Sequence, residues 1–142
     1  MLKYQLTHPE ILSALASAGH GSQVLIADGN YPFSTGANPH ARRVFLNLSP
    51  GSVPADQVLA VITDAIAVEA AHVMVPEDGS EPGIFASFRR HLPAGVVLQP
   101  MGRFQFYEAA RGPDVALVIA TGEQRIYANI LLTLGVVLTG AS

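Results

Sequence analysis

The sequence contains no cysteine among its 142 residues. Disulfide bonds, thiol nucleophiles and metal sites built on cysteine are therefore excluded. Charged residues are also scarce, at 13%, whereas a soluble domain usually carries roughly a quarter. Apolar residues make up 49% of the chain, so much apolar surface must be buried. Burial against further copies of the chain is the simplest solution, and we expect a homo-oligomer; a large apolar core in a monomer is the alternative.

Basic clusters and long apolar segments are missing as well. The few Lys and Arg residues are scattered and the net charge is −3, so we expect no nucleic-acid partner. The most apolar stretch, residues 58–75, is interrupted by Asp64, Glu69 and His72, and therefore predicts no membrane span. The N-terminal residues contain no apolar signal core, so we expect a cytoplasmic protein.

Short apolar runs alternate with helical patterns along the chain. Thr7 is the candidate N-cap of the first helix, because Glu10 follows three residues later. The patterns predict helices over 9–18, 54–66, 84–91 and 104–110, and strands over 24–27, 44–48, 72–75, 96–98 and 115–120. The apolar run over 130–138 fits either a strand or a buried helix. Strands that alternate with helices predict an α/β layered sheet in a single domain.

Several kinds of site are excluded by spacing. No two of the five histidines stand at the spacing of metal ligands, so we expect no metal. The segment Gly19-His20-Gly21 lacks the third glycine of a dinucleotide-binding loop and precedes a strand instead of following one. A serine nucleophile elbow is also missing from the sequence. Residues suited to acid–base chemistry and hydrogen bonding remain.

Five such residues are candidates, and each also has a plain structural explanation. His20 suits proton transfer, or a favourable contact with the C-terminal end of a helix. Asp28 directly follows the first strand, where ligands of α/β proteins usually bind, but it also fits an Asp-Gly turn. Arg103 stands among aromatic residues. It also fits a solvated side chain beside stacked apolar rings at the start of a helix. Tyr127 and Asn129 fit a loop that leads into the last apolar run.

Three motifs occur in a fixed order. They are Ala18-Gly19-His20-Gly21 followed by 24–28, then Arg103-Phe104-Gln105-Phe106-Tyr107-Glu108, then Thr121-Gly122-Glu123 followed by Tyr127-Ala128-Asn129. Taken together, they make the sequence similar to the fucose-mutarotase/ribose-pyranase family. The resemblance implies one mutarotase-like domain over 1–142. It also implies three layers, α/β/α, around a mixed, largely parallel sheet.

The resemblance also implies roles for individual residues. His20 falls on the family's catalytic acid, and Tyr127 is expected to act with it in proton transfer. Asp28, Arg103, Tyr127 and Asn129 fall on sugar-binding positions. The family needs no cofactor and no metal. Its members form homo-oligomeric rings or stacked rings, with a decamer as one possibility, and their sugar sites lie near subunit contacts.

The implied activity is that of a cofactor-independent isomerase that interconverts the α and β anomers of a free monosaccharide. The motif that begins at Arg103 resembles the fucose branch, whereas Tyr127-Ala128-Asn129 resembles the ribose branch. The longer motif favours L-fucose, with D-ribose pyranase as the alternative. Two other classes stay open: a non-catalytic sugar-binding partner of a transporter, and a purely structural oligomeric domain.

Overall fold

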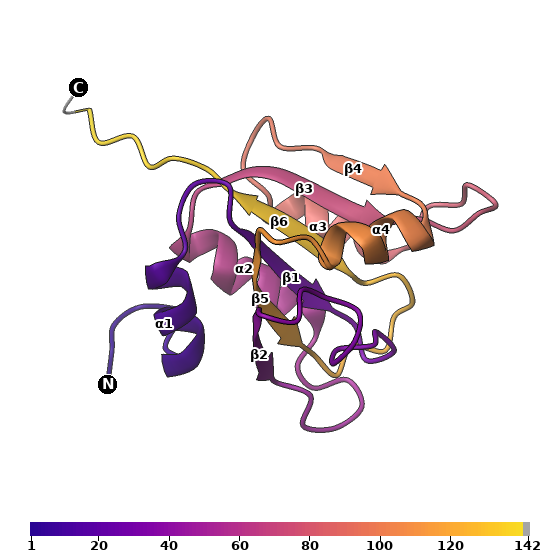
Figure 1. Cartoon of the computed structure of the whole chain (residues 1–142), viewed down its shortest axis with the longest axis horizontal. Helices are drawn as coiled ribbons and strands as arrows, with labels where there is room; N and C mark the ends of the chain where they lie inside the picture. The colour runs from indigo at the N-terminus through magenta and orange to yellow at the C-terminus, as the bar shows by residue number, and fades with distance from the viewer. Residues whose placement is uncertain (141–142) are drawn as a thin grey trace.

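The structure, a computed structural model, describes residues 1–140 and contains a six-stranded sheet with helices on both of its faces (Figure 1). The elements in chain order are α1 (Pro9–Ser17), β1 (Gln23–Ala27), β2 (Arg42–Phe45), α2 (Ala55–Ala65), β3 (Val68–Met74), α3 (Ile84–His91), β4 (Leu98–Met101), α4 (Arg103–Ala110), β5 (Val115–Ala120) and β6 (Ile130–Leu134).

The strands lie in the order β2-β5-β1-β6-β3-β4. β5 is parallel to both β1 and β2, and β3 is parallel to β4. β6 lies antiparallel between β1 and β3, so the other five strands all run in one direction. The α/β class with a mixed, largely parallel sheet is therefore confirmed. As a consequence, the carboxyl ends of β1, β3 and β4 share one edge of the sheet.

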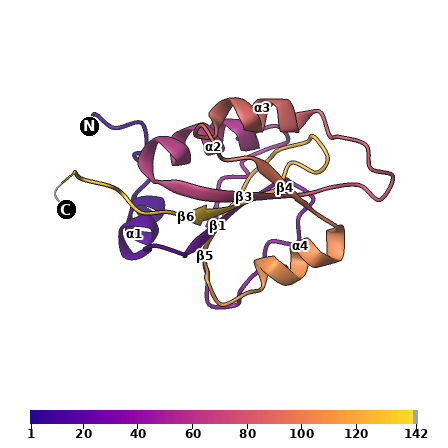
Figure 2. The same cartoon turned by 90° about the horizontal axis from the view of Figure 1, so that it is seen from above.

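The central strands are apolar on both faces, which is typical of a sheet that helices cover on both sides. Val24 and Ile26 of β1 join the larger core, to which α1, α2 and α3 contribute. Leu25 and Ala27 point to the opposite face, where they pack with Phe106 of α4 and with the loop over 31–41. Figure 2 shows α2 and α3 on one side of the sheet and α4 on the other.

The run over 130–138 forms a strand only as far as Leu134, and the expected alternative of a buried helix is wrong. β2, β3 and β4 are displaced from their predicted ranges by two to four residues at one or both ends, which apolar patterns alone do not fix. The first helix is capped by His8 and not by Thr7. The Nδ1 atom of His8 accepts a hydrogen bond from the Ile11 backbone N–H at 3.4 Å.

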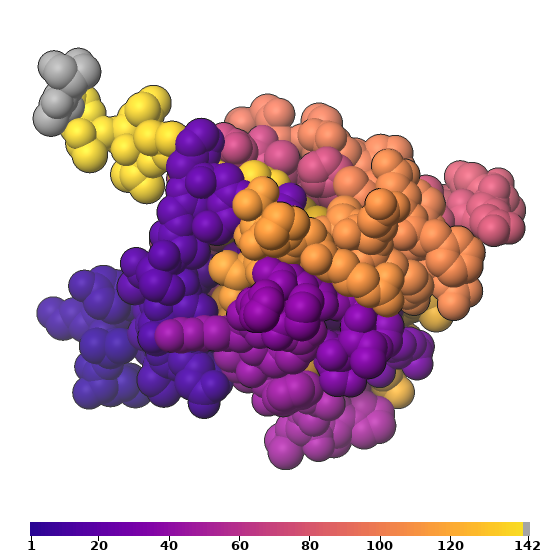
Figure 3. All heavy atoms as spheres, in the orientation of Figure 1, coloured from indigo at the N-terminus to yellow at the C-terminus, as the bar shows by residue number. Residues whose placement is uncertain are grey.

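Beyond β6 the chain leaves the body of the molecule as an extended arm (Figures 1 and 3). Val136, Val137 and Leu138 on this arm are 57%, 72% and 89% exposed. Within residues 1–140, no helix has the length and apolar character needed to cross a membrane.

Candidate functional site

Asp28 lies at the carboxyl end of β1, beside the residue that precedes β6. Because β6 is antiparallel to β1, Asn129 meets Asp28 across the sheet edge. The Asp28 backbone N–H donates to Asn129 Oδ1 at 2.7 Å, and Asn129 Nδ2 donates to Asp28 Oδ2 at 3.3 Å. The Asn30 backbone N–H donates to Asp28 Oδ1 at 3.0 Å. Asp28 is thereby held in one orientation by groups on both sides of it.

Burial raises the pKa of the Asp28 carboxyl above its ordinary value of 3.8, since only 4% of the residue is exposed. Hydrogen bonds from backbone N–H groups and from Asn129 act in the opposite direction without cancelling the effect of burial. A carboxylate that is poorly solvated but faces a cleft is a strong hydrogen-bond acceptor for the hydroxyl groups of a ligand.

Stability measurements test this raised pKa. Protonation of Asp28 favours the folded state, because the folded pKa lies above the unfolded one. The wild type should therefore be most stable relative to Asp28→Asn below pH 3.8, and should lose that advantage as the pH rises through the folded pKa. Urea unfolding of both proteins over this range, at equal protein concentration, measures the difference. A difference that does not change with pH would contradict a raised pKa.

A cleft of about 250 Å³ opens beside Asp28. It is lined by Asp28, Asn30, Tyr31, Met74, Arg103, Tyr107, Ile126 and Tyr127. A volume of this order suits a small molecule such as a monosaccharide better than a polymer. The structure thus brings three of the five sequence-predicted residues into one cleft, with Asn129 directly behind the carboxylate of Asp28.

Tyr127 enters the cleft from a strained backbone. Its φ of 59° places it in the left-handed region, the only residue other than glycine among those described to do so. This conformation costs a residue with a side chain ~1–3 kcal/mol, and such strain is concentrated at functional sites. Its neighbours Ala128 and Asn129 are buried and fix the backbone on the C-terminal side.

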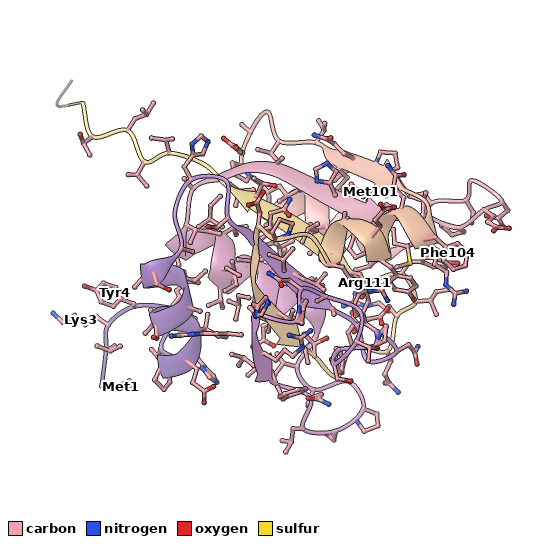
Figure 4. All side chains as sticks on the ribbon, in the orientation of Figure 1. Met1, Lys3, Tyr4, Met101, Phe104 and Arg111 are labelled. Carbon is pink, nitrogen blue, oxygen red and sulfur yellow. The ribbon has the colours of Figure 1, made fainter. Side chains whose placement is uncertain are left out.

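Arg103 is the first residue of α4 and lies at the carboxyl end of β4. Its guanidinium carbon is 5.4 Å from the ring centre of Phe104 and 5.8 Å from that of Tyr107. Tyr107 in turn contacts the ring of Tyr31 edge to face at 5.4 Å. Figure 4 shows Phe104 at the outer end of α4, where its side chain is 74% exposed. The aromatic rings therefore support the guanidinium at the cleft without neutralising its charge.

The loop that carries Tyr127 is fastened by a buried carboxylate, Glu123, to which its sequence motif assigned no role. Glu123 is 5% exposed and forms an ion pair with Arg125 at 2.5 Å. Arg125 also pairs with Asp56 of α2 at 2.9 Å, and the Ser87 hydroxyl of α3 donates to Asp56 at 2.7 Å. Glu123 and Arg125 are close in the sequence, but Asp56 and Ser87 are far from them, and no local pattern could have revealed these two partners. They hold the loop between β5 and β6 against two helices.

A substitution at Gly122, at the start of this loop, tests how closely the loop packs against residues 49–52. A Cβ atom there would lie 2.0 Å from the Ser52 carbonyl oxygen and 2.4 Å from that of Ser49. We expect Gly122→Ala to lower the free energy of unfolding by about 3 kcal/mol or more, the upper range for overpacking. Gly83→Ala is the matched control, since nothing lies within 4 Å of its Cβ position. Chemical denaturation of both variants measures the effect, and equal stabilities would contradict the packing.

A second cleft, of about 430 Å³, lies next to the first and shares Asn30 with it. Its wall consists mainly of amide, hydroxyl and backbone groups. The one carboxylate in it, Glu123, is already paired with Arg125. The smaller cleft is therefore the better candidate for chemistry, because it combines the carboxylate of Asp28, a phenol and a guanidinium.

His20 lies outside the cleft of its own chain. It precedes β1, whereas Asp28 follows that strand, and the five residues of β1 alone span roughly 16 Å. The His20 side chain is 60% exposed, and its Nε2 atom lies 3.0 Å from Glu69 Oε2 at the start of β3. A single chain thus separates the predicted proton donor from the other four site residues.

Five lining residues were not among the sequence-predicted ligands: Asn30, Tyr31, Met74, Tyr107 and Ile126. A signal did exist for three of them, since Asn30 and Tyr31 belong to the turn after Asp28 and Tyr107 belongs to the aromatic motif around Arg103. Met74 and Ile126 carry no such signal, because only the pairing of β3 with β4 and the course of the last loop place them here.

Comparison with known proteins identifies the family of this chain. The model of the RbsD / FucU transport protein family matches residues 1–137. Fucose mutarotase of Bos taurus is 34% identical over 139 residues, with 92% of this chain and 90% of the relative covered. D-ribose pyranase of Paracidovorax citrulli is 30% identical over 136 residues, with 96% and 98% covered. The structure of Bacillus subtilis RbsD complexed with D-ribose superposes with a TM-score of 0.81 at 26% identity, covering 97% of this chain and all of that one (100%). The chain therefore belongs to the RbsD / FucU transport protein family.

Proposed function

We propose that this protein is a sugar mutarotase that interconverts the α and β anomers of L-fucose or a similar deoxyhexose. The observation that carries the proposal is the cleft that combines Asp28, Arg103 and Tyr127 in a chain of this family. The relatives named above are a fucose mutarotase and a D-ribose pyranase, and both names describe the opening and closing of a sugar ring. We infer that the protein acts in the cytoplasm and needs no cofactor.

The chemistry requires two proton transfers. Ring opening takes the proton from the anomeric hydroxyl and delivers one to the ring oxygen, while the bond between that oxygen and the anomeric carbon breaks and a carbonyl forms. Reclosure on the other face reverses both transfers. In our proposal, His20 protonates the ring oxygen, and Tyr127 or a water that it orients takes the anomeric proton. Positioned acid–base groups typically accelerate such steps by roughly 10²–10⁴-fold.

The remaining residues bind and orient the sugar. The Asp28 carboxylate accepts from sugar hydroxyls, and Asn129 keeps that carboxylate in place. The Arg103 guanidinium donates to sugar oxygens from the rim of the cleft, and its planar fork fixes their direction. We also assign Asn129 a direct sugar contact in the bound state, as the family resemblance implies.

The position of His20 leads to a site that two copies of the chain share. Because His20 lies beyond the far end of β1, it reaches a sugar only in the cleft of a second copy. Exposed apolar side chains beside the cleft, Ile126 at 66% and Phe104 at 74%, suit burial against that copy. A homo-oligomer of this kind, as a ring or stacked rings, gives each cleft its proton donor.

D-Ribose is the second candidate substrate. The sequence Tyr127-Ala128-Asn129 resembles the ribose branch, and Ala128 is fully buried behind the cleft. The proposed preference for a deoxyhexose rests instead on Arg103 and on the aromatic motif that follows it.

Binding measurements discriminate the two sugars. Saturation-transfer difference NMR is carried out with L-fucose, D-ribose and L-fucitol. L-Fucose should give the strongest signal, and a competing ligand should reduce that signal. L-Fucitol is the matched control, because it carries similar hydroxyls but cannot close a hemiacetal ring. Stronger binding of D-ribose would move the protein to the pyranase branch. Binding of L-fucose without any exchange of its anomers would favour a sugar-binding partner of a transporter, and no binding at all would favour a structural domain.

A further inference from the structure

The ion pair between His20 and Glu69 lies apart from the cleft of its own chain, and the mechanism above gives Glu69 no role. His20 Nε2 is 3.0 Å from Glu69 Oε2, and the two side chains are 60% and 45% exposed. An exposed pair of this kind contributes little to stability, typically up to about 1 kcal/mol. The backbone, however, fixes the positions of both His20 and Glu69. A chance contact between two surface side chains would not need such fixed positions.

Glu69 is the extra residue of a β-bulge. Val68 pairs with Leu134 of β6 and Ala70 pairs with Thr133, so Glu69 has no partner of its own in the ladder. Bulges re-aim a side chain and are frequent next to active sites. The bulge packs against Gly135, where a Cβ atom would lie only 3.2 Å from the Cβ of Glu69. The backbone therefore turns Glu69 out of the regular strand at this point.

His20 is held from the other side by a tight turn. Gly21, which follows it, adopts a φ of +87° that favours glycine. The Gly21 N–H donates to the Leu134 carbonyl at 3.0 Å, and the Leu134 N–H donates to the Ser22 carbonyl at 2.9 Å. The turn that carries His20 is thus fastened to the same end of β6 that pairs with the bulge.

The pair determines which ring nitrogen is free. An ionised carboxylate can only accept hydrogen bonds, so the Nε2 atom that faces Glu69 must carry a proton. In the neutral ring, Nδ1 is then the nitrogen with the lone pair. We propose that Glu69 is a positioning residue for His20, which holds the Nε2–H so that Nδ1 exchanges the proton with the ring oxygen of the sugar.

The inference rests on the proposed function, and its proton balance follows from it. The imidazolium form donates from Nδ1 to the ring oxygen as the bond to the anomeric carbon breaks, which leaves the neutral ring with its proton on Nε2. Ring closure returns the proton to Nδ1. Glu69 accepts a hydrogen bond in both states and is not itself protonated.

Two measurements test the inference, and the first needs no sugar. ¹⁵N NMR of the histidine rings, at a pH well above the ordinary titration range of histidine, should show the Nε2–H form for His20 in the wild type. Glu69→Ala should shift His20 toward a mixture of the two tautomers. An unchanged ¹⁵N pattern in Glu69→Ala would overturn the hold of Glu69 on the ring, whatever reaction the protein catalyses.

The second measurement is the rate of anomer exchange. Glu69→Ala should lower kcat by about tenfold to a hundredfold, the range for losing a hydrogen bond to a charged group, with KM little changed. Glu69→Gln, which keeps an acceptor oxygen, should recover part of the loss. The exposed Glu77→Ala is the matched control and should keep the wild-type rate. A wild-type kcat in Glu69→Ala, or a rise in KM alone, would overturn the positioning role.

Two variants distinguish the role of His20 from that of Glu69. If His20→Ala exchanges anomers at the wild-type rate, the proposed role of His20 is wrong, and Nδ1 has no proton transfer for Glu69 to position. If His20→Ala is inactive while Glu69→Ala is fully active, only the positioning role of Glu69 is wrong.

Discussion

Replacing His20 with Ala is expected to lower the rate of anomer exchange by roughly 10²–10⁴-fold while the fold and the oligomer persist. The reason is that no other group in the proposed site has the acid–base range of an imidazole near neutral pH. His20 is largely exposed and belongs to neither core cluster, so its removal should leave no cavity. The sugar should still bind, because Asp28 and Arg103 remain in the cleft.

The measurement combines kinetics with a structural control. Exchange rates are compared for the wild type, His20→Ala and His40→Ala, which removes another exposed histidine from outside the cleft. Circular dichroism and size-exclusion chromatography should be the same for all three proteins. Wild-type exchange in His20→Ala would remove this residue from the mechanism. A loss in His40→Ala of the same size would show that the assay responds to histidine removal in general.

Mixing two inactive variants is expected to restore activity, which is the second large effect. His20→Ala keeps an intact cleft, whereas Asp28→Asn keeps the proton donor but disables its own cleft. If donor and cleft come from different copies, equal mixing gives about a quarter of the clefts both functional parts, provided subunits assort randomly. Restored activity near a quarter of the wild-type rate is then the expected result.

The control for this experiment is the same mixture without subunit exchange. The two variants are unfolded together and refolded for the test, or simply combined in the folded state for the control. Co-refolded protein should be active, and the double variant His20→Ala/Asp28→Asn should not be. Inactive co-refolded oligomers of normal size would place His20 and Asp28 in the same subunit's site, against the geometry of β1.

Much of the cleft was predictable from the sequence for a physical reason. Asp28 follows a buried apolar strand, and in α/β folds the carboxyl ends of parallel strands are where ligands bind. Arg103 follows β4, and this strand runs parallel to β1, so Arg103 reaches the same edge. The motif residues around Arg103 reach this edge because of strand direction, which the alternation of helices and strands already indicated.

Other features depend on pairings that no local pattern contains. The antiparallel direction of β6 brings Asn129 to Asp28, yet the apolar run over 130–138 was equally compatible with a helix. The Glu123–Arg125–Asp56 network joins residues up to 69 positions apart. The bulge at Glu69 arises from register alone. The separation of His20 from Asp28, by contrast, follows from the length of β1, a strand that the apolar pattern already predicted over 24–27.

The central claim is that the protein opens and closes sugar rings, and NMR of L-fucose in the presence of the wild-type protein tests it most directly. Saturation of the α anomeric proton should decrease the β anomeric signal in proportion to the concentration of protein, because uncatalysed mutarotation is too slow to transfer magnetisation. The same protein after heat denaturation should give no transfer. If folded wild-type protein transfers no magnetisation between the anomers of L-fucose, and none between the ring forms of D-ribose, the proposed activity is contradicted.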